Sequence, residues 1–452
     1  MPVADVLEAV EDHIARAPDY DMYRDYERGE HRHPYLSDWF KQQHSQKLGK
    51  ENMCPAVLSN YADRVQLSAW AGAGAKAATD LAETLGLSRI LNLTVREAFR
   101  AGDAYILVWP NSRGELIPRY HRADTVAYRA SDDDPDEFDW VAKLWVDGKH
   151  GRVTVYYPDR IERWVTASEV RADRKSKVSW PTDESGFLPY ADDDGDAEIR
   201  YGTALIPAFG MVPWAHIPFE ADEQGGHGRS LLRDVIPKQD KLNSEESALI
   251  LNTENYAEPM RVLMNHRNST ALDPNTGKPV ENKVSIDSSR KRTYAFEGAG
   301  PFQQFEPANS THILAVKNET KAALAHVAGI PVSDIAPDLG NIPSGVSLRV
   351  LASRRTAALR DFNDSSTPAV SRVVALLGIE DAVPVWADPA PEDESEQWEI
   401  AEARDRLGFP LGENLRAMGW DQDDIDRVLD AQGGEEAAVG RAARLAFEQG
   451  RA

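Results

Sequence analysis

Cysteine is almost absent from this chain of 452 residues, which contains only Cys54. A single cysteine cannot form an internal disulfide or a thiolate-cluster metal site, so both are excluded. We expect Cys54 to be a small buried hydrophobic side chain.

Long hydrophobic runs are also missing, because charged residues interrupt each apolar stretch. The first residues, MPVADVLEAVEDHIARA, lack the basic, apolar and small-residue order of a signal peptide. We therefore expect neither a membrane protein nor a secreted one. Hydrophobic residues still make up 42% of the chain, which indicates a folded protein with room for about three domains.

Positive charge is scarce, since 51 Lys and Arg face 74 Asp and Glu and leave a formal net charge of −23. Proteins that grip nucleic acid use clustered Lys and Arg, so any contact with DNA should be loose. The acids concentrate in 132–139, 192–196 and 380–402, which we expect to be solvated loops.

Metal-binding and catalytic motifs are missing as well. A calcium loop in DDDGD (192–196) fails because its template needs Gly where this chain has Ala197. His31 and His33 have no carboxylate or Cys at a ligand spacing, so we expect surface histidines. Without GxxxxGK[ST], GxSxG, HExxH or CxxC, we expect no enzyme, no metal and no cofactor. A carboxylate-dependent nuclease built from separate segments is the enzymatic alternative.

Apolar periodicity predicts helices in the first hundred residues. The first helix covers 3–14 and ends at Pro18, with Val3, Val6, Leu7, Val10 and Ile14 facing inward. Residues 51–70 are expected to be helical after Pro55, with Val57, Tyr61, Val65 and Leu67 turned inward. A further helix is expected near 94–101.

From Gly102 the period changes to the alternation of strands, which predicts an α+β fold with an antiparallel sheet. The expected strands are 104–109, 115–120, 140–147, 152–158 and 160–166. Residues 167–200 are polar and are expected to lie outside the sheet. The sheet is expected to resume at 205–220. The aromatic residues of this region lie among acids in the sequence, so we expect core and subunit packing rather than a nucleic-acid stacking platform.

A helix is predicted over 237–256, with Pro237 in its first turn. Leu242, Leu249 and Tyr256 recur every seven residues along it, the pattern of a helix packed beside copies of itself or one partner. A β-rich module at 258–307 separates it from a second helix at 309–329. The apolar stripe of the second helix is Ile313, Val316, Ala323, Leu324 and Val327.

The segment GIPVSDIAPDLGNIPSG (329–345) is a proline-rich loop between helices. Proline lowers the freedom of the unfolded chain and glycine permits turns, so a stiff loop without a core of its own is predicted. An ordinary surface loop is the alternative. Its characteristic residues are Pro331, Pro337, Gly340, Pro343 and Gly345.

Helix is expected again over 344–377, with a kink or break at Pro368. Its inward residues are Val346, Val350, Leu351, Leu359 and Phe362. Helices near 396–407, 412–418 and 421–431 follow an acidic linker.

This order of elements resembles the portal proteins of tailed bacteriophages, specifically the SPP1-like portal family of actinobacteriophages, over about 20–380. None of the local matches is a catalytic signature, and their collinear order makes the resemblance. They are YERGEH (26–31), NMCPAVLSNYADRV (52–65), AGDAYILVWPNSRGEL (101–116), GRSLLRDVIPKQDKLN (228–243) and IPSGVSLR (342–349). The segment 167–200 and the tail beyond about Glu392 have no match.

The resemblance implies a phage portal fold assembled as a ring of twelve subunits. Its parts would be a wing (1–228), a stem helix (229–257), a clip (258–307), a second stem helix (308–329), a tunnel loop (330–345), a long helix returning to the wing (346–389) and a helical crown or tail (390–452).

The resemblance also implies a function: a ring-shaped DNA channel at one vertex of the virion capsid, assembled in the host cytoplasm. Such a portal docks the terminase for genome packaging, retains and later ejects double-stranded DNA, and connects head to tail. The implied partners are further copies of the chain, DNA without sequence specificity, the major capsid protein, the terminase large subunit and a head-completion or adaptor protein, with no membrane. A capsid scaffold or adaptor that forms no channel is the structural alternative.

The negative net charge of the chain is consistent with this implied channel. Twelve copies, each with −23, would carry −276 formal charges, which repel the phosphate backbone and let DNA slide. Sparse cations would then guide the DNA. The candidates are Lys317, Lys321, Arg349, Arg354 and Arg355. The alternative is that these cations form salt bridges to neighbouring acids such as Glu319 or Asp361.

Overall fold

The computed structural model describes residues 2–32, 50–171, 178–190, 203–204, 209–257, 261–264, 270–272, 275–276, 279–281, 293–296, 303–304, 310–336, 345–390, 394–417 and 425–429. The chain divides into two compact units. The larger comprises Met1–Pro343 with Val350–Pro389, and the smaller comprises Ser344–Arg349 with Ala390–Ala452.

The first helix, α1 (Pro2–Arg28), continues through Pro18, so the predicted end at this proline is wrong. Proline inside a helix removes one backbone hydrogen bond, but packing of the following turns compensates. The side chains that supply this packing are Tyr20, Tyr23 and Tyr26, all buried.

The buried stripe of α1 also differs from the prediction near the proline. Val6 and Val10 are buried as expected, whereas Ile14 is 41% exposed. The stripe passes instead through His13 and Ala17, which lead at helical spacing to the buried tyrosines.

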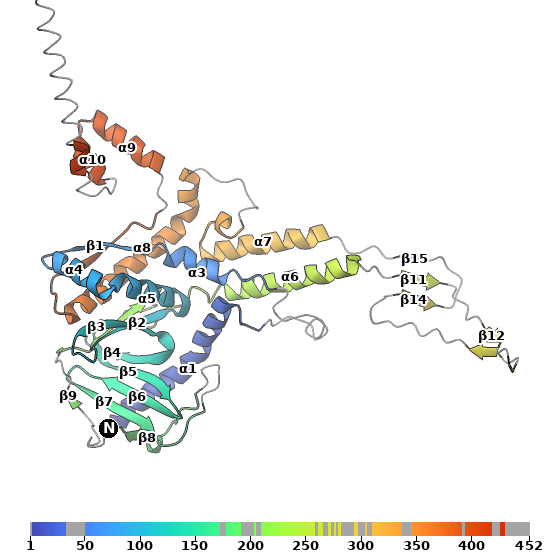
Figure 1. Ribbon diagram of the computed structural model, residues 1–452, viewed down its shortest axis with the longest axis horizontal. Coiled ribbons are helices and arrows are strands. Elements are labelled where there is room, and N and C mark those ends of the chain that lie inside the picture. The colour runs from blue at the N-terminus through green and yellow to red at the C-terminus, as the bar shows by residue number, and fades with distance from the viewer. Residues whose placement is uncertain are drawn as a thin grey trace, which may run out of the picture. The chain divides into compact units, whose positions relative to one another are not determined.

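An antiparallel sheet of six strands forms the largest β-structure (Figure 1). Its order is β4 (Val126–Ala130), β5 (Phe138–Asp147), β6 (His150–Tyr156), β7 (Arg160–Thr166) and β8 (Phe187–Pro189), with β9 (Thr203–Ala204) also paired to β7. A second antiparallel sheet has the order β10 (Trp214–Pro218), β2 (Asp103–Pro110), β3 (Leu116–Arg122). These sheets confirm the α+β class and the predicted strands within the described residues, whereas β4, β8 and β9 were not foreseen. The expectation that 167–200 leaves the sheet is wrong for β8, which pairs with β7.

The six-stranded sheet buries side chains on both faces. On one face, Val6 and Val10 of α1 pack with a cluster that includes Trp140, Leu144 and Val153. Part of the other face packs against the β10–β2–β3 sheet. Its residues Val141, Tyr156 and Ile161 belong to the main hydrophobic core. The residues of the two clusters alternate along the strands, because successive side chains of a strand point to opposite faces of the sheet.

Helix α5 (Leu87–Ala101) packs against the second sheet, and α3 (Cys54–Ala62) and α4 (Ala75–Leu85) pack against α5. Cys54, Val57, Tyr61 and Val65 are buried as predicted. The expected continuation of helix toward residue 70 is wrong, because β1 (Leu67–Ala71) pairs antiparallel with the distant strand β16 (Val383–Trp386).

The helices α6 (Ile236–Ala257) and α7 (Ser310–Ala328) confirm the two predicted around the β-rich module, and they lie side by side (Figure 1). Short strands β11 (Arg261–Met264), β12 (Thr270–Leu272), β13 (Pro279–Glu281), β14 (Thr293–Phe296) and β15 (Gln303–Gln304) lie between them in sequence. Strand β11 pairs in parallel with β14 and antiparallel with β15. Apart from 275–276, the remaining residues of the predicted module lie outside the described residues.

A 3-10 turn, η3 (Val332–Asp334), follows α7, and α8 (Gly345–Leu376) then runs through Pro368 without ending there. Leu359 and Phe362 are buried as predicted. Val350 and Leu351, expected inward, are 68% and 54% exposed, and Ala352 is the first buried side chain among those of α8 that the structure describes. The side chain of Val346 lies outside the described residues.

The smaller unit holds α9 (Glu394–Arg406) and α10 (Leu411–Ala417), which confirm two predicted helices. Residues 425–429 are also helical, within the third predicted segment. Leu415 and Ile425 are buried in this unit.

Candidate functional site

The helices predicted to line a channel form a hairpin joined by polar contacts. The Thr320 hydroxyl of α7 donates a hydrogen bond to Glu245 Oε1 of α6, 2.8 Å away. Lys317, one turn earlier on α7, forms an ion pair with Glu246. Because the paired positions run in opposite directions along the two helices, α6 and α7 are antiparallel.

Glu51, just before α3, links this hairpin to the N-terminal part of the chain. Its carboxylate lies 2.8 Å from Lys317 Nζ and 2.5 Å from Lys321 Nζ. Burial alone would raise the pKa of Glu51, but the hydrogen bonds from the two lysines outweigh it and lower that pKa. Burial likewise opposes the charge of Lys317, whose pKa is nevertheless raised by Glu246 and Glu51.

Two of the predicted DNA-contacting cations, Lys317 and Lys321, are therefore engaged in ion pairs within the chain. Their partners are Glu51 and Glu246 rather than the expected Glu319 or Asp361. No local spacing in the sequence connects Glu51 to α7, so only the fold reveals the pairing. Contact of either lysine with DNA stays a prediction.

A buried amide pair fixes the start of α6. Gln239 and Asn243, one turn apart, are fully buried. Gln239 Oε1 accepts a hydrogen bond from Met53 N at 2.8 Å, and Gln239 Nε2 donates to Glu51 O at 2.6 Å. Asn243 Oδ1 accepts from Glu51 N at 3.1 Å. The entry segment of α3 is thus bonded through its backbone to one face of α6.

His31 belongs to the same buried region, so its assignment as a surface histidine is wrong. It is 2% exposed and its ring stacks on Tyr26 with centroids 4.0 Å apart. Asn243 Nδ2 donates to His31 Nε2 at 3.1 Å. His33 lies outside the described residues.

The residues that recur every seven positions along α6 lie in different environments. Leu242 is fully buried against the chain itself, and Leu249 is half-buried. Tyr256 lies in the helix, but its side chain is outside the described residues. Farther along the hairpin, Leu251, Ile313 and Val316 are half-buried and Leu314 is 44% exposed. The part of the hairpin next to the β module therefore leaves apolar surface uncovered within one chain.

The predicted arginine candidates lie near the start of α8. Arg355 is 1% exposed, and its Nη1 lies 2.9 Å from Asp334 Oδ2 and also contacts Asn60. Burial and the charge of Arg64 lower the pKa of Arg355. Arg354 is exposed and donates to His326 O at 3.2 Å. The side chain of Arg349 lies outside the described residues.

The first part of the predicted tunnel loop packs on the core, contrary to the expectation of a segment without one. Gly329 has a left-handed φ of +70°, as a turn at the end of α7 requires. After Pro331, Ile335 and Ala336 are buried. The Tyr61 hydroxyl also donates to Ala328 O at 2.8 Å. Pro337, Gly340 and Pro343 lie outside the described residues, and Gly345 begins α8.

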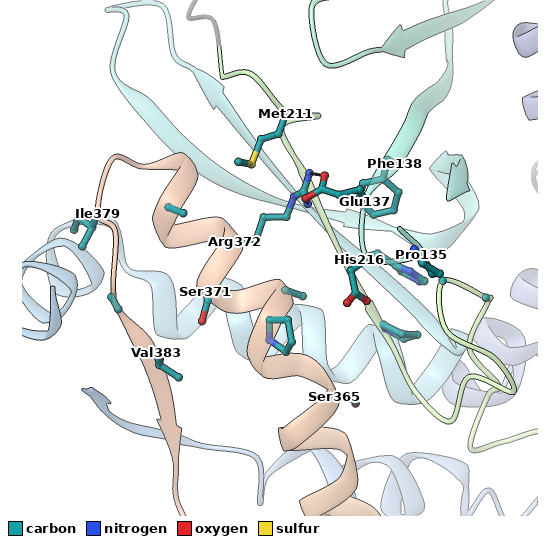
Figure 2. Close-up of a pocket in the computed structure, with 18 of the residues that line it drawn as sticks. Pro135, Glu137, Phe138, Met211, His216, Ser365, Ser371, Arg372, Ile379 and Val383 are labelled. Carbon is teal, nitrogen blue, oxygen red and sulfur yellow. Dashed lines mark hydrogen bonds and ion pairs between the residues drawn. The ribbon is translucent and has the colours of Figure 1, made fainter. Parts of the chain in front are cut away.

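A cavity of about 480 Å³ lies beside the second half of α8 (Figure 2). Arg372 of α8 reaches across it and forms a two-point ion pair with Glu137, at 2.8 and 2.9 Å. The guanidinium lies 5.4 Å from the ring centroid of Phe138 and donates to Val212 O at 3.2 Å. These contacts neutralise the arginine and attach α8 to the start of β5, which is a structural role.

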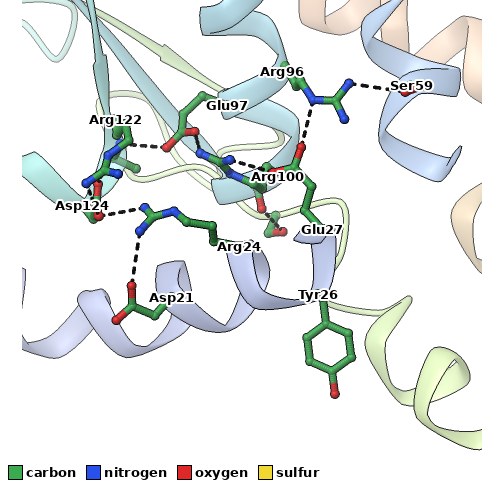
Figure 3. A network of polar contacts seen from close by, with 12 residues as sticks. Asp21, Arg24, Tyr26, Glu27, Ser59, Arg96, Glu97, Arg100, Arg122 and Asp124 are labelled. Atoms are coloured by element: carbon green, nitrogen blue, oxygen red, sulfur yellow. Dashed lines mark hydrogen bonds and ion pairs between the residues drawn. The ribbon is translucent and has the colours of Figure 1, made fainter. Parts of the chain in front are cut away.

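A second polar network attaches α1 to α5 and to the β3–β4 connection (Figure 3). Arg24 Nη2 lies 2.7 Å from Asp124, and Glu27 accepts hydrogen bonds from Arg96 at 2.9 Å and Arg100 at 2.7 Å. Burial opposes the charge of Glu27, but both arginines lower its pKa. Each acid in this network has a basic partner, so it holds elements together and offers no free nucleophile or base.

Within the part of the chain that the structure describes, no cluster of three or more His, Cys, Asp or Glu could hold a metal ion. In the same residues, no helix combines the length and apolar character needed to span a membrane.

No protein-family model matches the chain, and no curated protein matches it. Among solved structures, a chain from the neck of a native GTA particle computed with C12 symmetry is 13% identical, with a TM-score of 0.45, covering 81% of this chain and 89% of that one. A chain from the neck of an empty GTA particle computed with C6 symmetry is 12% identical, with a TM-score of 0.44, covering 85% and 93%. A chain from the virion of a native gene transfer agent particle is 13% identical, with a TM-score of 0.43, covering 81% and 89%. Likenesses of this size carry no argument about function.

Proposed function

We propose that the chain is a portal protein, in which identical copies close side by side into a ring around a channel for double-stranded DNA at one capsid vertex. The observation that carries the proposal is the α6–α7 hairpin, with a β-rich module between its helices and the long helix α8 after it. This is the order of stem, clip, stem and returning helix that the resemblance to phage portals requires.

The uncovered apolar surface of the hairpin supports association of copies. Next to the β module, Leu314 is 44% exposed and Leu249 and Leu251 are only half-buried. Apolar side chains gain free energy when a partner removes them from water. A neighbouring copy of the same hairpin presents matching apolar residues, and repetition of one such contact closes a ring when the rotation between copies fits.

Charge supports passage of DNA rather than tight binding. The net charge of −23 repels phosphate, and two hairpin lysines, Lys317 and Lys321, are already paired with carboxylates. A channel surface with few unpaired cations offers few binding sites for DNA phosphates. Arg354, exposed at the start of α8, remains as a weak guiding contact in this proposal.

The remaining roles follow from the resemblance. The ring would have twelve subunits, dock the terminase large subunit through its clip, join the major capsid protein through its wing and receive a head-completion protein. It would have no catalytic activity of its own.

The experiment that tests the proposal is negative-stain microscopy of the purified full-length protein, with its mass measured in solution. We expect rings with a central hole wide enough for duplex DNA and a mass close to twelve chains. Compact particles without a hole would support a scaffold or adaptor protein instead. Metal-dependent cleavage of DNA by the purified protein would support the nuclease.

A further inference from the structure

One face of the six-stranded sheet is covered by the second sheet over only part of its width. Beyond the covered part, strand register aligns two rows of side chains across β5, β6 and β7. The first row is Lys143, Thr154 and Arg163, and the second is Trp145, Arg152 and Val165. Side chains directly opposite each other on neighbouring strands lie in contact range, so these rows place aromatic and basic groups together.

A cavity of about 220 Å³ opens over these rows. Its walls include Trp109, Trp145, Tyr156, Tyr190, Arg152 and Arg163. Trp109 meets Tyr156 edge to face with centroids 5.4 Å apart, and the Arg152 guanidinium lies 4.0 Å from the Tyr190 ring centroid. The cavity is therefore lined by aromatic rings and guanidinium groups, and it has room for one planar side chain.

Two cations lie beside this cavity without lining it. Lys143 is opposite the lining residue Thr154 in the register of β5 and β6, and Arg119 of β3 stands two residues from Ile117, the partner of the lining residue Trp109. Lys143 Nζ lies 5.1 Å from the Trp145 ring centroid, and neither Lys143 nor Arg119 of β3 takes part in an ion pair among the described residues. Arg152, by contrast, pairs with Asp147 at 2.7 Å. Burial and the charge of Arg119 lower the pKa of Lys143, so the two cations repel each other. An anion placed between the two cations would relieve this repulsion.

The fold thus changes the sequence interpretation of these aromatic residues. In the sequence they stand among acids, but in the structure Trp109, Trp145 and Tyr156 gather beside basic side chains. Sequence spacing alone cannot show this, because Arg119, Lys143 and Arg152 come from three different strands.

We propose that this aromatic–basic pocket binds a segment of a partner protein in which an aromatic side chain is flanked by carboxylates. The aromatic ring would enter the cavity, and the carboxylates would pair with Lys143 and Arg119. Binding energy at protein interfaces concentrates in such central pockets, which are rich in Trp, Tyr and Arg. Arginine is also well suited to carboxylates because its planar fork can form two parallel hydrogen bonds.

A nucleic-acid base would also stack in an aromatic cavity. A polynucleotide, however, brings a dense row of phosphates toward a protein with a net charge of −23, and electrostatic repulsion grows with each added phosphate. A peptide with one ring and a few carboxylates needs only the local cations. Charge complementarity therefore favours the peptide.

The test measures binding of a fluorescein-labelled peptide, EEDFEDE, to the full-length protein by fluorescence anisotropy. Two matched peptides, EEDAEDE without the ring and KKNFKNK with reversed charge, are measured beside it. We expect EEDFEDE to bind at least tenfold more tightly than either. Equal binding of EEDFEDE and EEDAEDE, or no binding of EEDFEDE at 1 mM protein, overturns the proposal.

Variants of the protein locate the site. We expect Trp145→Ala and Lys143→Glu each to weaken binding of EEDFEDE at least tenfold, and the exposed Lys76→Glu on α4 to leave it unchanged. Arg119→Glu gives a second charge reversal should Lys143→Glu fail to fold, which thermal unfolding checks. Tighter binding of dAMP or oligo(dT) than of the peptide, lost in the same variants, overturns the proposal in favour of a nucleotide site. The test does not require a ring, so its failure leaves the portal proposal standing.

Discussion

The carboxylate of Asp103 and the imidazole of His216 are buried together, with Oδ1 and Nε2 2.8 Å apart. The same carboxylate accepts hydrogen bonds from Arg16 Nη2 at 2.5 Å, the Tyr20 hydroxyl at 2.9 Å and Gly228 N at 2.8 Å. Burial alone would raise the pKa of Asp103, but hydrogen bonds from His216 and His227 hold it well below its usual range. One side chain therefore joins α1, β2, β10 and the segment leading to α6.

Replacement of Asp103 by Asn should lower the free energy of unfolding by about 3 to 5 kcal/mol, because it removes the nearest carboxylate from the largely buried Arg16 and leaves only Asp12, 4.0 Å away, as its acidic partner. Urea unfolding followed by tryptophan fluorescence, at one protein concentration, measures the change. The exposed Asp80→Asn on α4 is the matched control and should change stability by no more than about 0.5 kcal/mol. A similarly small effect at Asp103 would show that its buried hydrogen bonds contribute little.

His121 should make stability depend on pH. Burial, with Lys143 and Arg119 nearby, lowers its pKa to about 3, whereas an unfolded histidine titrates near 6.5. Between these values the unfolded chain binds a proton that the folded chain does not, so the free energy of unfolding falls as pH is lowered. The contribution is about 1 kcal/mol per pH unit.

His121→Gln should therefore lose stability more gradually than the natural protein between pH 6 and pH 4, by about 1 kcal/mol per pH unit. Carboxylates contribute equally to both proteins and cancel in the comparison. His312→Gln, at an exposed position on α7, should follow the natural protein. Parallel curves for all three proteins would remove His121 as the source.

Sequence patterns predicted those elements that local spacing determines. Alternation along 140–147 and 152–158 identified β5 and β6, because each strand buries one set of side chains in each core. The helix over 237–256 was found for the same reason, with α6 running from Ile236 to Ala257. The predicted helix end at Pro18 was wrong because proline commonly ends helices, whereas here the buried tyrosines after Pro18 stabilise the continued helix.

Contacts between distant segments were beyond reach of the same patterns. β1 was missed because its partner β16 lies near the other end of the chain. The pairing of Glu51 with Lys317 and Lys321 was missed for the same reason, although salt bridges to acids were the predicted alternative to DNA contacts for these lysines. His31 was misplaced because its partner Asn243 comes from α6.

The link between Glu51 and Lys321 should be measurable as a coupling energy. We expect Glu51→Gln to lower the free energy of unfolding by about 1 to 2 kcal/mol, since two lysines lose a charged hydrogen-bond partner. Lys321→Met should lower the free energy of unfolding by about 1 kcal/mol less in the Glu51→Gln variant than in the natural protein. Strictly additive effects would mean that the ion pair contributes nothing.

The pH dependence of this pair has a defined sign. The pKa of Glu51 is lowered in the folded protein, so its contribution is present above the pKa of an unfolded glutamate and is lost as pH falls through the folded value. The coupling between Glu51 and Lys321 should therefore shrink in acid. A double-mutant cycle repeated at pH 7 and at pH 3 measures this change.

Leu314 should control assembly of the proposed ring. A carboxylate at this 44% exposed position on α7 would have to be taken out of water at a contact between hairpins, so Leu314→Glu should give smaller assemblies in mass photometry. Leu188→Glu, at a 52% exposed position on β8, is the control and should leave the mass unchanged. Identical mass distributions for both variants and the natural protein would place the contact between copies elsewhere.

Cys54 should be chemically silent in the folded protein. Its side chain is fully buried, and burial raises the pKa of the thiol to about 12, so the reactive thiolate is scarce at neutral pH. We expect a thiol reagent such as 5,5′-dithiobis(2-nitrobenzoic acid) at pH 8 to react about 100-fold more slowly with the native protein than with the protein in guanidinium chloride. The variant Ala77→Cys, which adds a thiol at an exposed position on α4, should show one fast equivalent under native conditions. Rapid reaction of the natural protein, at the rate of that added thiol, would mean that α3 opens readily and that Cys54 does not stay in the core.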